Sequence, residues 1–164
     1  MQFRSVFSLV GSPLRDRSRA VRALVAAMAA TTALPAASTP SGAAVSITVS
    51  NLRNERGVVQ ACLTSVARHF PDCSHDPAAR HMSVNARTGM VLEFTNVPPG
   101  TYAIALLHDE NGNGRADRVL MVPREGFGFS RDAPVRMGPP SFDSAAFTVG
   151  TAAVRHTIRM RYML

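Results

Sequence analysis

Two sets of residues alternate in the stretch Val154-Arg155-His156-Thr157-Ile158-Arg159-Met160-Arg161 near the C-terminal end of the sequence. One set is mostly apolar and contains Val154, Ile158 and Met160, whereas the other contains three arginines and a threonine. Strict alternation of this kind is typical of a β-strand with one buried face and one face in water. The sequence therefore predicts a strand within residues 153–162, with His156 on the inward face.

Shorter runs of the same kind occur along the chain and are separated by turn signals such as Val97-Pro98-Pro99-Gly100. Many short strands joined by Gly- and Pro-rich turns indicate an all-β protein. We predict a single antiparallel β-sandwich of about seven strands, immunoglobulin-like or prealbumin-like in kind. Residues 65–80 break the pattern, and we expect a loop with one helical turn there. The other predicted strands cover residues 45–49, 58–63, 90–95, 101–108, 118–122 and 145–149.

Residues 1–43 have the composition of an export signal. Five arginines precede an alanine-rich apolar run over residues 23–34, and small residues follow it. These are the three parts of a secretory signal peptide, and the run is shorter than the roughly 20 residues of a bilayer span. We expect a signal peptide with a short linker at residues 1–43 and a β-sandwich domain at residues 44–164. An amphipathic helix of the folded domain is the alternative interpretation of the run.

This division predicts a periplasmic or secreted protein with no transmembrane anchor in the mature chain, and it changes the charge balance. The whole chain has a formal net charge of +7, and all of its basic residues are arginine. From Ser38 onward it has 13 Arg and 10 acidic residues, a net charge of +3. These arginines are scattered, without a basic run or interleaved aromatic residues, so we expect no nucleic-acid binding. The absence of lysine excludes Schiff-base chemistry.

Cys62 and Cys73 are the two cysteines of the chain. An oxidising compartment permits a disulfide between them, which would close a small loop and stabilise the domain by roughly 2–3 kcal/mol. Two unpaired thiols are the alternative. The spacing is far from that of a CxxC motif, so we expect neither redox catalysis nor a zinc site.

The stretch of residues 108–117, His-Asp-Glu-Asn-Gly-Asn-Gly-Arg-Ala-Asp, is dense in oxygen ligands. Counted from Asp109, side-chain oxygens fall at positions 1, 3, 5 and 9, with Gly114 at position 6. This is the D-x-[DN]-x-[DN]-G spacing of Ca²⁺ loops, so we predict a Ca²⁺ site of roughly 10⁻⁴–10⁻³ M affinity. An ion-free turn, in which these side chains bond the loop backbone, is the alternative. The predicted ligands are Asp109, Asn111, Asn113, Asp117, the backbone carbonyl of Arg115, and Glu125, which folds back toward the loop.

Four motifs occur in a fixed order, and together they resemble the DUF2141 family of exported bacterial proteins, which has no established activity. The resemblance covers about residues 45–160. It implies a compact β-sandwich and supplies no catalytic residues. The motifs are Asn96-Val97-Pro98-Pro99-Gly100-Thr101-Tyr102-Ala103, the stretch of residues 108–117, Pro123-Arg124-Glu125-Gly126-Phe127-Gly128-Phe129-Ser130, and Gly138-Pro139-Pro140-Ser141-Phe142-Asp143.

Aromatic side chains in loops beside the Asp/Asn stretch define a second candidate region. They either anchor the loops to one another or form an exposed apolar surface that recognises a ligand or partner. The residues predicted for such a surface are His108, Phe127, Phe129, Ser130 and Phe142.

We therefore expect a non-enzymatic exported module that binds Ca²⁺ and presents its aromatic loops to an envelope protein or a small ligand. The alternative is a metal-assisted or His/carboxylate hydrolase centred on His108, Asp109 and Glu125. A purely structural envelope component is the third possibility. No strand-turn-helix elbow surrounds Ser130, so a serine nucleophile is not expected.

Overall fold

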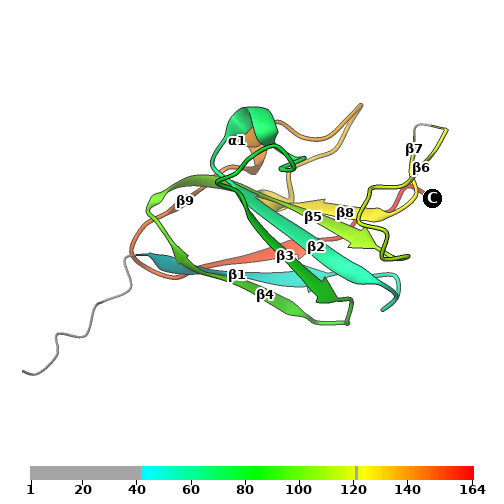
Figure 1. Ribbon diagram of the computed structural model, residues 1–164, viewed down its shortest axis with the longest axis horizontal. Coiled ribbons are helices and arrows are strands. Elements are labelled where there is room, and N and C mark those ends of the chain that lie inside the picture. The colour runs from blue at the N-terminus through cyan, green and yellow to red at the C-terminus, as the bar shows by residue number, and fades with distance from the viewer. Residues whose placement is uncertain (1–41, 121) are drawn as a thin grey trace, which may run out of the picture. The chain divides into compact units, whose positions relative to one another are not determined.

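The computed structural model describes residues 42–120 and 122–164, so the predicted signal peptide lies outside the described residues. Two β-sheets form the body of the domain (Figure 1). Their strands are β1 (Ala43–Ser50), β2 (Val58–Thr64), β3 (Arg80–Asn85), β4 (Val91–Val97), β5 (Gly100–Asp109), β8 (Gly126–Phe129), β9 (Phe147–Val149) and β10 (Val154–Arg159). One sheet has the order β10-β1-β4, and the other has the order β3-β2-β5-β8, with β9 pairing the start of β5.

One hydrophobic core is built from both sheets. Ile47 of β1, Ile104 of β5 and Ile158 of β10 are fully buried in it. Every second residue of β1 is buried, as the alternating sequence predicts for a strand with one face on the core. The prediction of an all-β sandwich is therefore confirmed.

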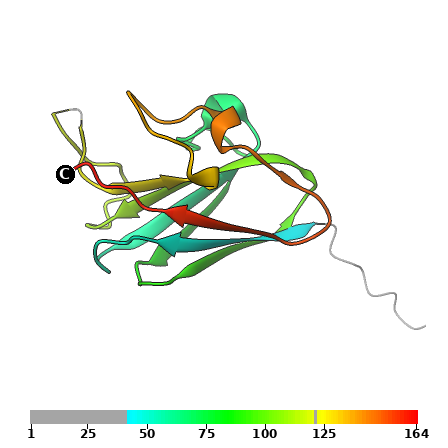
Figure 2. The ribbon, with the colours of Figure 1, turned by 180° about the vertical axis from the view of Figure 1, so that it is seen from behind.

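The first and last strands of the described domain lie side by side, as Figure 2 shows from behind. β10 runs parallel to β1, with Val154 beside Val45 and Ile158 beside Val49. The other strand pairs of the described residues are antiparallel. The expectation of a wholly antiparallel sandwich is wrong for this pair. After β9, which pairs with β5 of the larger sheet, the chain crosses to the smaller sheet and β10 runs in the same direction as β1.

Two strands, β3 and β8, were not predicted from the sequence. β3 is an edge strand with most of its residues exposed, and its only apolar residues are Met82 and Val84, too few for a clear alternating pattern. β8 contains Gly126 and Gly128, which weaken the strand pattern. Both glycines allow a close approach: a Cβ at Gly126 would lie 2.3 Å from the Tyr162 ring, and one at Gly128 would lie 2.7 Å from Ile158.

The predicted strand at residues 118–122 is instead a small hairpin. It consists of β6 (Arg118–Val119) and β7 (Val122–Pro123), which pair antiparallel. Leu120 between them has a φ of +48°, in the left-handed region that bulky residues rarely adopt. A single continuous strand cannot contain this turn.

The helices are short: η1 (Ala67–His69), η2 (Ser130–Asp132) and α1 (Phe142–Ala145). η1 is the helical turn expected within residues 65–80. α1 covers the start of the strand predicted at residues 145–149, which begins only at Phe147 as β9. Within the described residues, no helix has both the length and the apolar character that a membrane span requires.

A disulfide joins Cys62 of β2 to Cys73 in the loop that follows η1, with the two Cα atoms 6.4 Å apart. Both cysteines are buried. Because β2 lies in the middle of the larger sheet, the bond fixes this long loop to the body of the domain.

Candidate functional site

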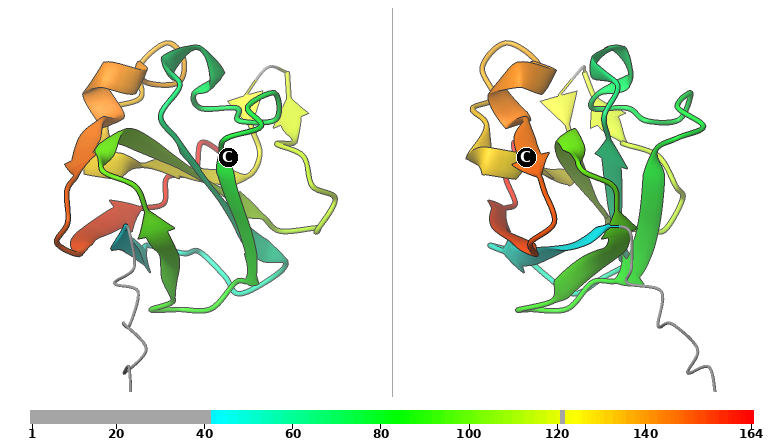
Figure 3. Two further views of the ribbon diagram at one scale, coloured as in Figure 1. Left: turned by 60° about the vertical axis from the view of Figure 1, so that its left-hand side comes forward. Right: turned by 90° about the vertical axis from the view of Figure 1, so that its left-hand side faces the viewer.

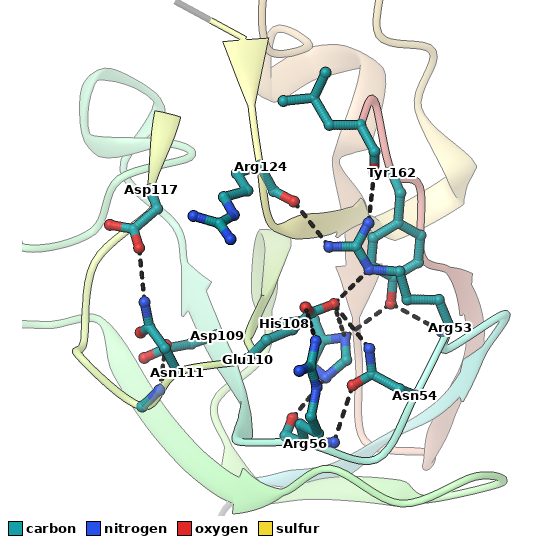
Figure 4. A network of polar contacts seen from close by, with 12 residues as sticks. Arg53, Asn54, Arg56, His108, Asp109, Glu110, Asn111, Asp117, Arg124 and Tyr162 are labelled. Atoms are coloured by element: carbon teal, nitrogen blue, oxygen red, sulfur yellow. Dashed lines mark hydrogen bonds and ion pairs between the residues drawn. The ribbon is translucent and has the colours of Figure 1, made fainter. Parts of the chain in front are cut away.

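A polar cavity of about 150 Å³ lies where the loop after β5 meets the β6–β7 hairpin and the segment after β1. Figure 4 shows this region from close by. Most of the cavity wall is charged: two arginines and three acids surround one asparagine. The lining residues are Arg56, Glu110, Asn111, Asp117, Arg124 and Glu125.

Asp109 ends β5 and determines the shape of the loop. Its carboxylate is fully buried and accepts four hydrogen bonds. Oδ1 accepts from the backbone N–H groups of Gly112 (2.7 Å) and Asn113 (3.1 Å). Oδ2 accepts from the backbone N–H of Gly114 (2.7 Å) and from the Gln60 side chain (2.9 Å). Because a carboxylate has about four acceptor positions, Asp109 is saturated within the protein and organises the turn.

Asp117 is the carboxylate that the loop side chains surround. The amide nitrogen of Asn111 donates to it at 2.7 Å, and that of Asn113 donates to both of its oxygens at 3.1 Å. The amide oxygens of Asn111 and Asn113 instead accept backbone N–H groups within the loop. The backbone N–H of Arg115 donates one of these bonds, and the Arg115 side chain is exposed. This is the hydrogen-bond pattern of the ion-free turn that the sequence analysis gave as its alternative.

Glu125 lies beside Asp117, eight residues away in sequence, because the β6–β7 hairpin folds the chain back. Its Oε2 accepts the backbone N–H of Asp117 at 3.2 Å, and the residue is only 4% exposed. Burial raises the pKa of the Glu125 carboxyl, and the negative charges of Asp109 and Asp117 raise it further. Burial and these two neighbouring charges therefore disfavour the ionised form of Glu125.

The described residues contain no group of three or more His, Cys, Asp or Glu side chains arranged to hold a metal ion. A hard cation would have to use Asn111, Asp117 and Glu125 after their present hydrogen bonds rearrange. Oxygen donors of this kind suit Ca²⁺ better than they suit transition metals. Arg56 and Arg124 in the cavity wall lower the affinity expected for any cation.

The opposite wall of the cavity contains a paired carboxylate, Glu110. Its Oε1 accepts from Arg53 and from the Asn54 amide (3.2 Å), and its Oε2 accepts from Arg56 (3.2 Å). The hydrogen bond from Arg53 lowers the pKa of Glu110, and the charge of Arg53 and the Asn54 bond act in the same direction. Glu110 is thus ionised and held in place.

Arg53 joins three distant segments of the chain. Besides Glu110, its guanidinium donates to the backbone carbonyl of Leu164 and to that of Arg124 (3.0 Å). Its central carbon lies 4.5 Å from the centre of the Tyr162 ring, which is within the range of a cation–π contact. The bond to Glu110 raises the pKa of Arg53, so this residue carries a permanent charge.

His108 is fully buried, and both of its ring nitrogens have partners. Nδ1 lies 2.8 Å from the Tyr162 hydroxyl, and Nε2 lies 2.9 Å from the backbone oxygen of Arg56. Two roles were predicted for His108 from the sequence: part of a recognition surface or, alternatively, part of a hydrolase centre. The surface role is wrong, because the ring has no exposed atom to meet a ligand, and both ring nitrogens are engaged by groups of the protein.

The expected aromatic surface is instead largely a second, smaller core. Phe129 is buried, and Phe127 and Phe142 are half-buried. Phe70 packs between two of them, with ring centres 5.7 Å from Phe129 and 6.1 Å from Phe142. The structure thus favours the loop-anchoring alternative, because the rings gain more from mutual burial than from exposure to water.

Ser130, the remaining residue of the expected surface, is also fully buried. Its hydroxyl donates to the carbonyl of Ala145 at 2.6 Å and accepts the backbone N–H of Ile104 at 2.9 Å. Ser130 therefore links α1 to β5 and is not available to a ligand.

Several residues of the site were not predicted. Arg53, Asn54, Arg56, Gln60 and Tyr162 carry no motif, and their partners lie far away in the sequence; Tyr162, for example, is 109 residues from Arg53. The one available signal was the polar run Arg53-Asn54-Glu55-Arg56, which begins four residues after the end of the first predicted strand.

The fold and the cavity together define a small all-β module with a charged pocket at one end. The chain belongs to the DUF2141 family, which is described as an uncharacterized protein conserved in bacteria, and the family profile matches residues 47–157. This confirms the resemblance seen in the four sequence motifs. Comparisons with curated proteins and with solved structures find no match.

Proposed function

We propose that this domain is an exported, non-enzymatic binding module that takes a hard divalent cation, Ca²⁺, in the cavity beside residues 109–117. In this proposal Asp117 and Glu125 supply the carboxylates and Asn111 supplies an amide oxygen. Asp109 keeps the role of shaping the loop. The ligand set is therefore narrower than the six residues expected from the sequence alone.

The observation that carries the proposal is the position of Glu125. A buried carboxyl next to two other carboxylates is unfavourable when ionised, and its raised pKa expresses that cost. A divalent cation would remove the repulsion and provide a partner for the charge. The two arginines of the cavity wall oppose the cation, so the affinity belongs in the weak range of about 10⁻⁴–10⁻³ M.

The disulfide and the predicted signal peptide support a location outside the cytoplasm, because disulfides persist in oxidising compartments. Weak Ca²⁺ sites of this kind are typical of extracellular modules. We propose that the bound ion stiffens this end of the domain for an envelope protein or a small ligand, with the periplasm or the cell exterior as its place of action.

Thermal unfolding with and without Ca²⁺ tests the site. A cation at ten times its Kd stabilises the folded state by about 1.4 kcal/mol, which raises the Tm of a domain of this size by about 5 °C. The double variant Asp117→Asn/Glu125→Gln should lose this response. Asp143→Asn, which changes an exposed carboxylate in α1, is the matched control and should keep it.

Two results would contradict the proposal. One is an unchanged Tm of the unmodified protein at millimolar Ca²⁺. The other is an equal increase in the double variant, which would move the ion to another site. An equal response to Mg²⁺ would retain a cation site but remove the preference for Ca²⁺.

A further inference from the structure

Two loop tips hold large apolar side chains fully in water. Leu120, between β6 and β7, is 92% exposed. Met137, in the loop of residues 133–141, is fully exposed. The β6–β7 hairpin and the loop of residues 133–141 both project from the same side of the domain in Figures 1 and 3. We refer to Leu120 and Met137 as the two apolar tips.

Leu120 is placed at the tip despite an unfavourable backbone. Its φ of +48° suits glycine or asparagine, and its side chain gains no packing at 92% exposure. Neither turn geometry nor the hydrophobic core therefore accounts for a leucine at this position. A contact outside the domain would account for it.

The surroundings of the two apolar tips are basic. Residues 118–124 and 133–141 together contain three arginines and no acidic residue. Arg118, Arg124 and Arg136 are exposed, and within the described part of the chain none of their guanidinium groups pairs with a carboxylate. Other arginines near this end, Arg53 and Arg56, are paired with Glu110. Arg124 also lines the cavity beside three carboxylates, so Arg118 and Arg136 are the charges available to an anionic partner.

We propose that the two apolar tips, with Arg118 and Arg136 beside them, dock the domain onto a phospholipid surface that contains anionic headgroups. Apolar side chains that insert at the boundary of headgroups and acyl chains, together with basic residues beside them, are the elements of peripheral membrane binding. Two single side chains on separate protruding loops offer much less apolar area than the roughly 800 Å² per partner of a stable protein interface. A lipid surface requires no such area, since each side chain inserts separately.

The chain contains no tryptophan, so a single introduced tryptophan reports on its own position. The test uses the full chain with Leu120→Trp or Met137→Trp, and vesicles of phosphatidylglycerol mixed with phosphatidylcholine. Both variants should show a blue-shifted emission and quenching by brominated acyl chains. Val91→Trp is the matched control, because Val91 is 58% exposed on β4, on the opposite side of the domain (Figure 1). Any membrane binding by residues 1–41 is common to all three variants.

The charge requirement is tested with Arg118→Gln and Arg136→Gln. Each should weaken the vesicle affinity about fivefold, since one arginine near an anionic surface contributes on that scale. Arg87→Gln, an exposed arginine between β3 and β4, should leave the affinity unchanged. Vesicles of phosphatidylcholine alone should bind much more weakly. EDTA in the buffer makes the outcome independent of the proposed cation site.

The proposal is overturned if positions 120 and 137 show no spectral change, or if position 91 changes equally. Equal spectral changes at positions 120 and 137 on vesicles of phosphatidylcholine alone would also overturn it. A response to native envelope vesicles that disappears with their extracted lipids would assign the tips to a membrane protein instead. Thermal unfolding of each variant shows whether the fold is intact, and we expect it to be unchanged because both tips are fully exposed.

Discussion

Glu110 and Glu125 line the same small cavity, yet their surroundings differ in almost every respect. Glu110 accepts hydrogen bonds from Arg53, Arg56 and Asn54, and its pKa is lowered. Glu125 accepts hydrogen bonds from backbone N–H groups, and its pKa is raised by burial and by the charges of Asp109 and Asp117. One wall of the cavity is therefore electrostatically satisfied, and the other is not.

Within this one site, the two glutamates therefore differ in what they contribute to stability and to ligand binding. A carboxylate whose partners are provided by the fold contributes to stability and has little left to offer a ligand. A buried carboxylate without a cationic partner makes the free protein less stable and becomes favourable only when something else arrives. Glu125 is therefore the residue to alter when binding is tested, and Glu110 is the residue to alter when stability is tested.

The largest expected effect is that of Glu110→Gln. It removes the acceptor charge for Arg53, and hydrogen bonds to charged groups contribute about 1.5–3 kcal/mol each. We expect the free energy of unfolding at neutral pH to fall by about 2 kcal/mol, as measured by urea denaturation. Glu93→Gln on the exposed face of β4 should change it by less than about 0.5 kcal/mol. Equal losses in the two variants would mean that the Arg53–Glu110 cluster does not stabilise the fold.

Glu125→Gln should have the opposite sign. The neutral amide keeps an oxygen acceptor for the Asp117 N–H and removes a buried charge beside two carboxylates. We expect the free energy of unfolding, measured without divalent cations at neutral pH, to rise by about 1 kcal/mol, the usual size of a single-residue effect. A loss of stability would show that the charge of Glu125 has a partner in the folded protein.

The pH dependence sharpens the same contrast. The folded-state pKa of Glu125 is raised above its ordinary value of 4.5, so its protonated form stabilises the fold below that pH, and this contribution is lost as the pH rises. The advantage of Glu125→Gln over the unmodified protein should therefore disappear in acid. Glu110 behaves in reverse: its lowered pKa gives stability above 4.5 that is lost as the pH falls. Urea denaturation across this pH range measures both trends, and parallel curves for the two variants would contradict them.

The smallest expected effect is that of Arg56→Gln. The Arg56 side chain is 73% exposed, so solvent screens its ion pair with Glu110. We expect a loss of less than about 0.5 kcal/mol in the free energy of unfolding, and we expect it to vanish at high salt. A loss as large as that of Glu110→Gln would transfer the main role in the cluster from Arg53 to Arg56.

Many of the strands could be predicted from the sequence, because alternating apolar and polar residues indicate a strand with one buried face. β1, β5 and β10 each carry a period-two pattern, and each forms as predicted. β3 was missed because this exposed edge strand has only two alternating apolar residues, Met82 and Val84. β8 was missed because glycines replace side chains where the strand approaches its neighbours. The parallel direction of β10 depends on the path of the chain, which periodicity does not encode.

For the candidate site, the sequence located the loop but not its bonding. The Asp/Asn/Gly spacing correctly indicated a tight oxygen-rich turn, and it brought Glu125 into consideration. It could not show that the amide nitrogens of Asn111 and Asn113 face Asp117, because a calcium loop and an Asx turn use the same residues. The burial of His108 and its contact with Tyr162 depend on strands that meet only in the folded domain.

The parallel pairing of β1 and β10 has a consequence for how this domain is made. β1 is the middle strand of its sheet, and one of its two neighbours is supplied by residues 154–159. A nascent chain that ends before residue 154 cannot complete the smaller sheet, so this sheet forms only after residues 154–159 have been synthesised.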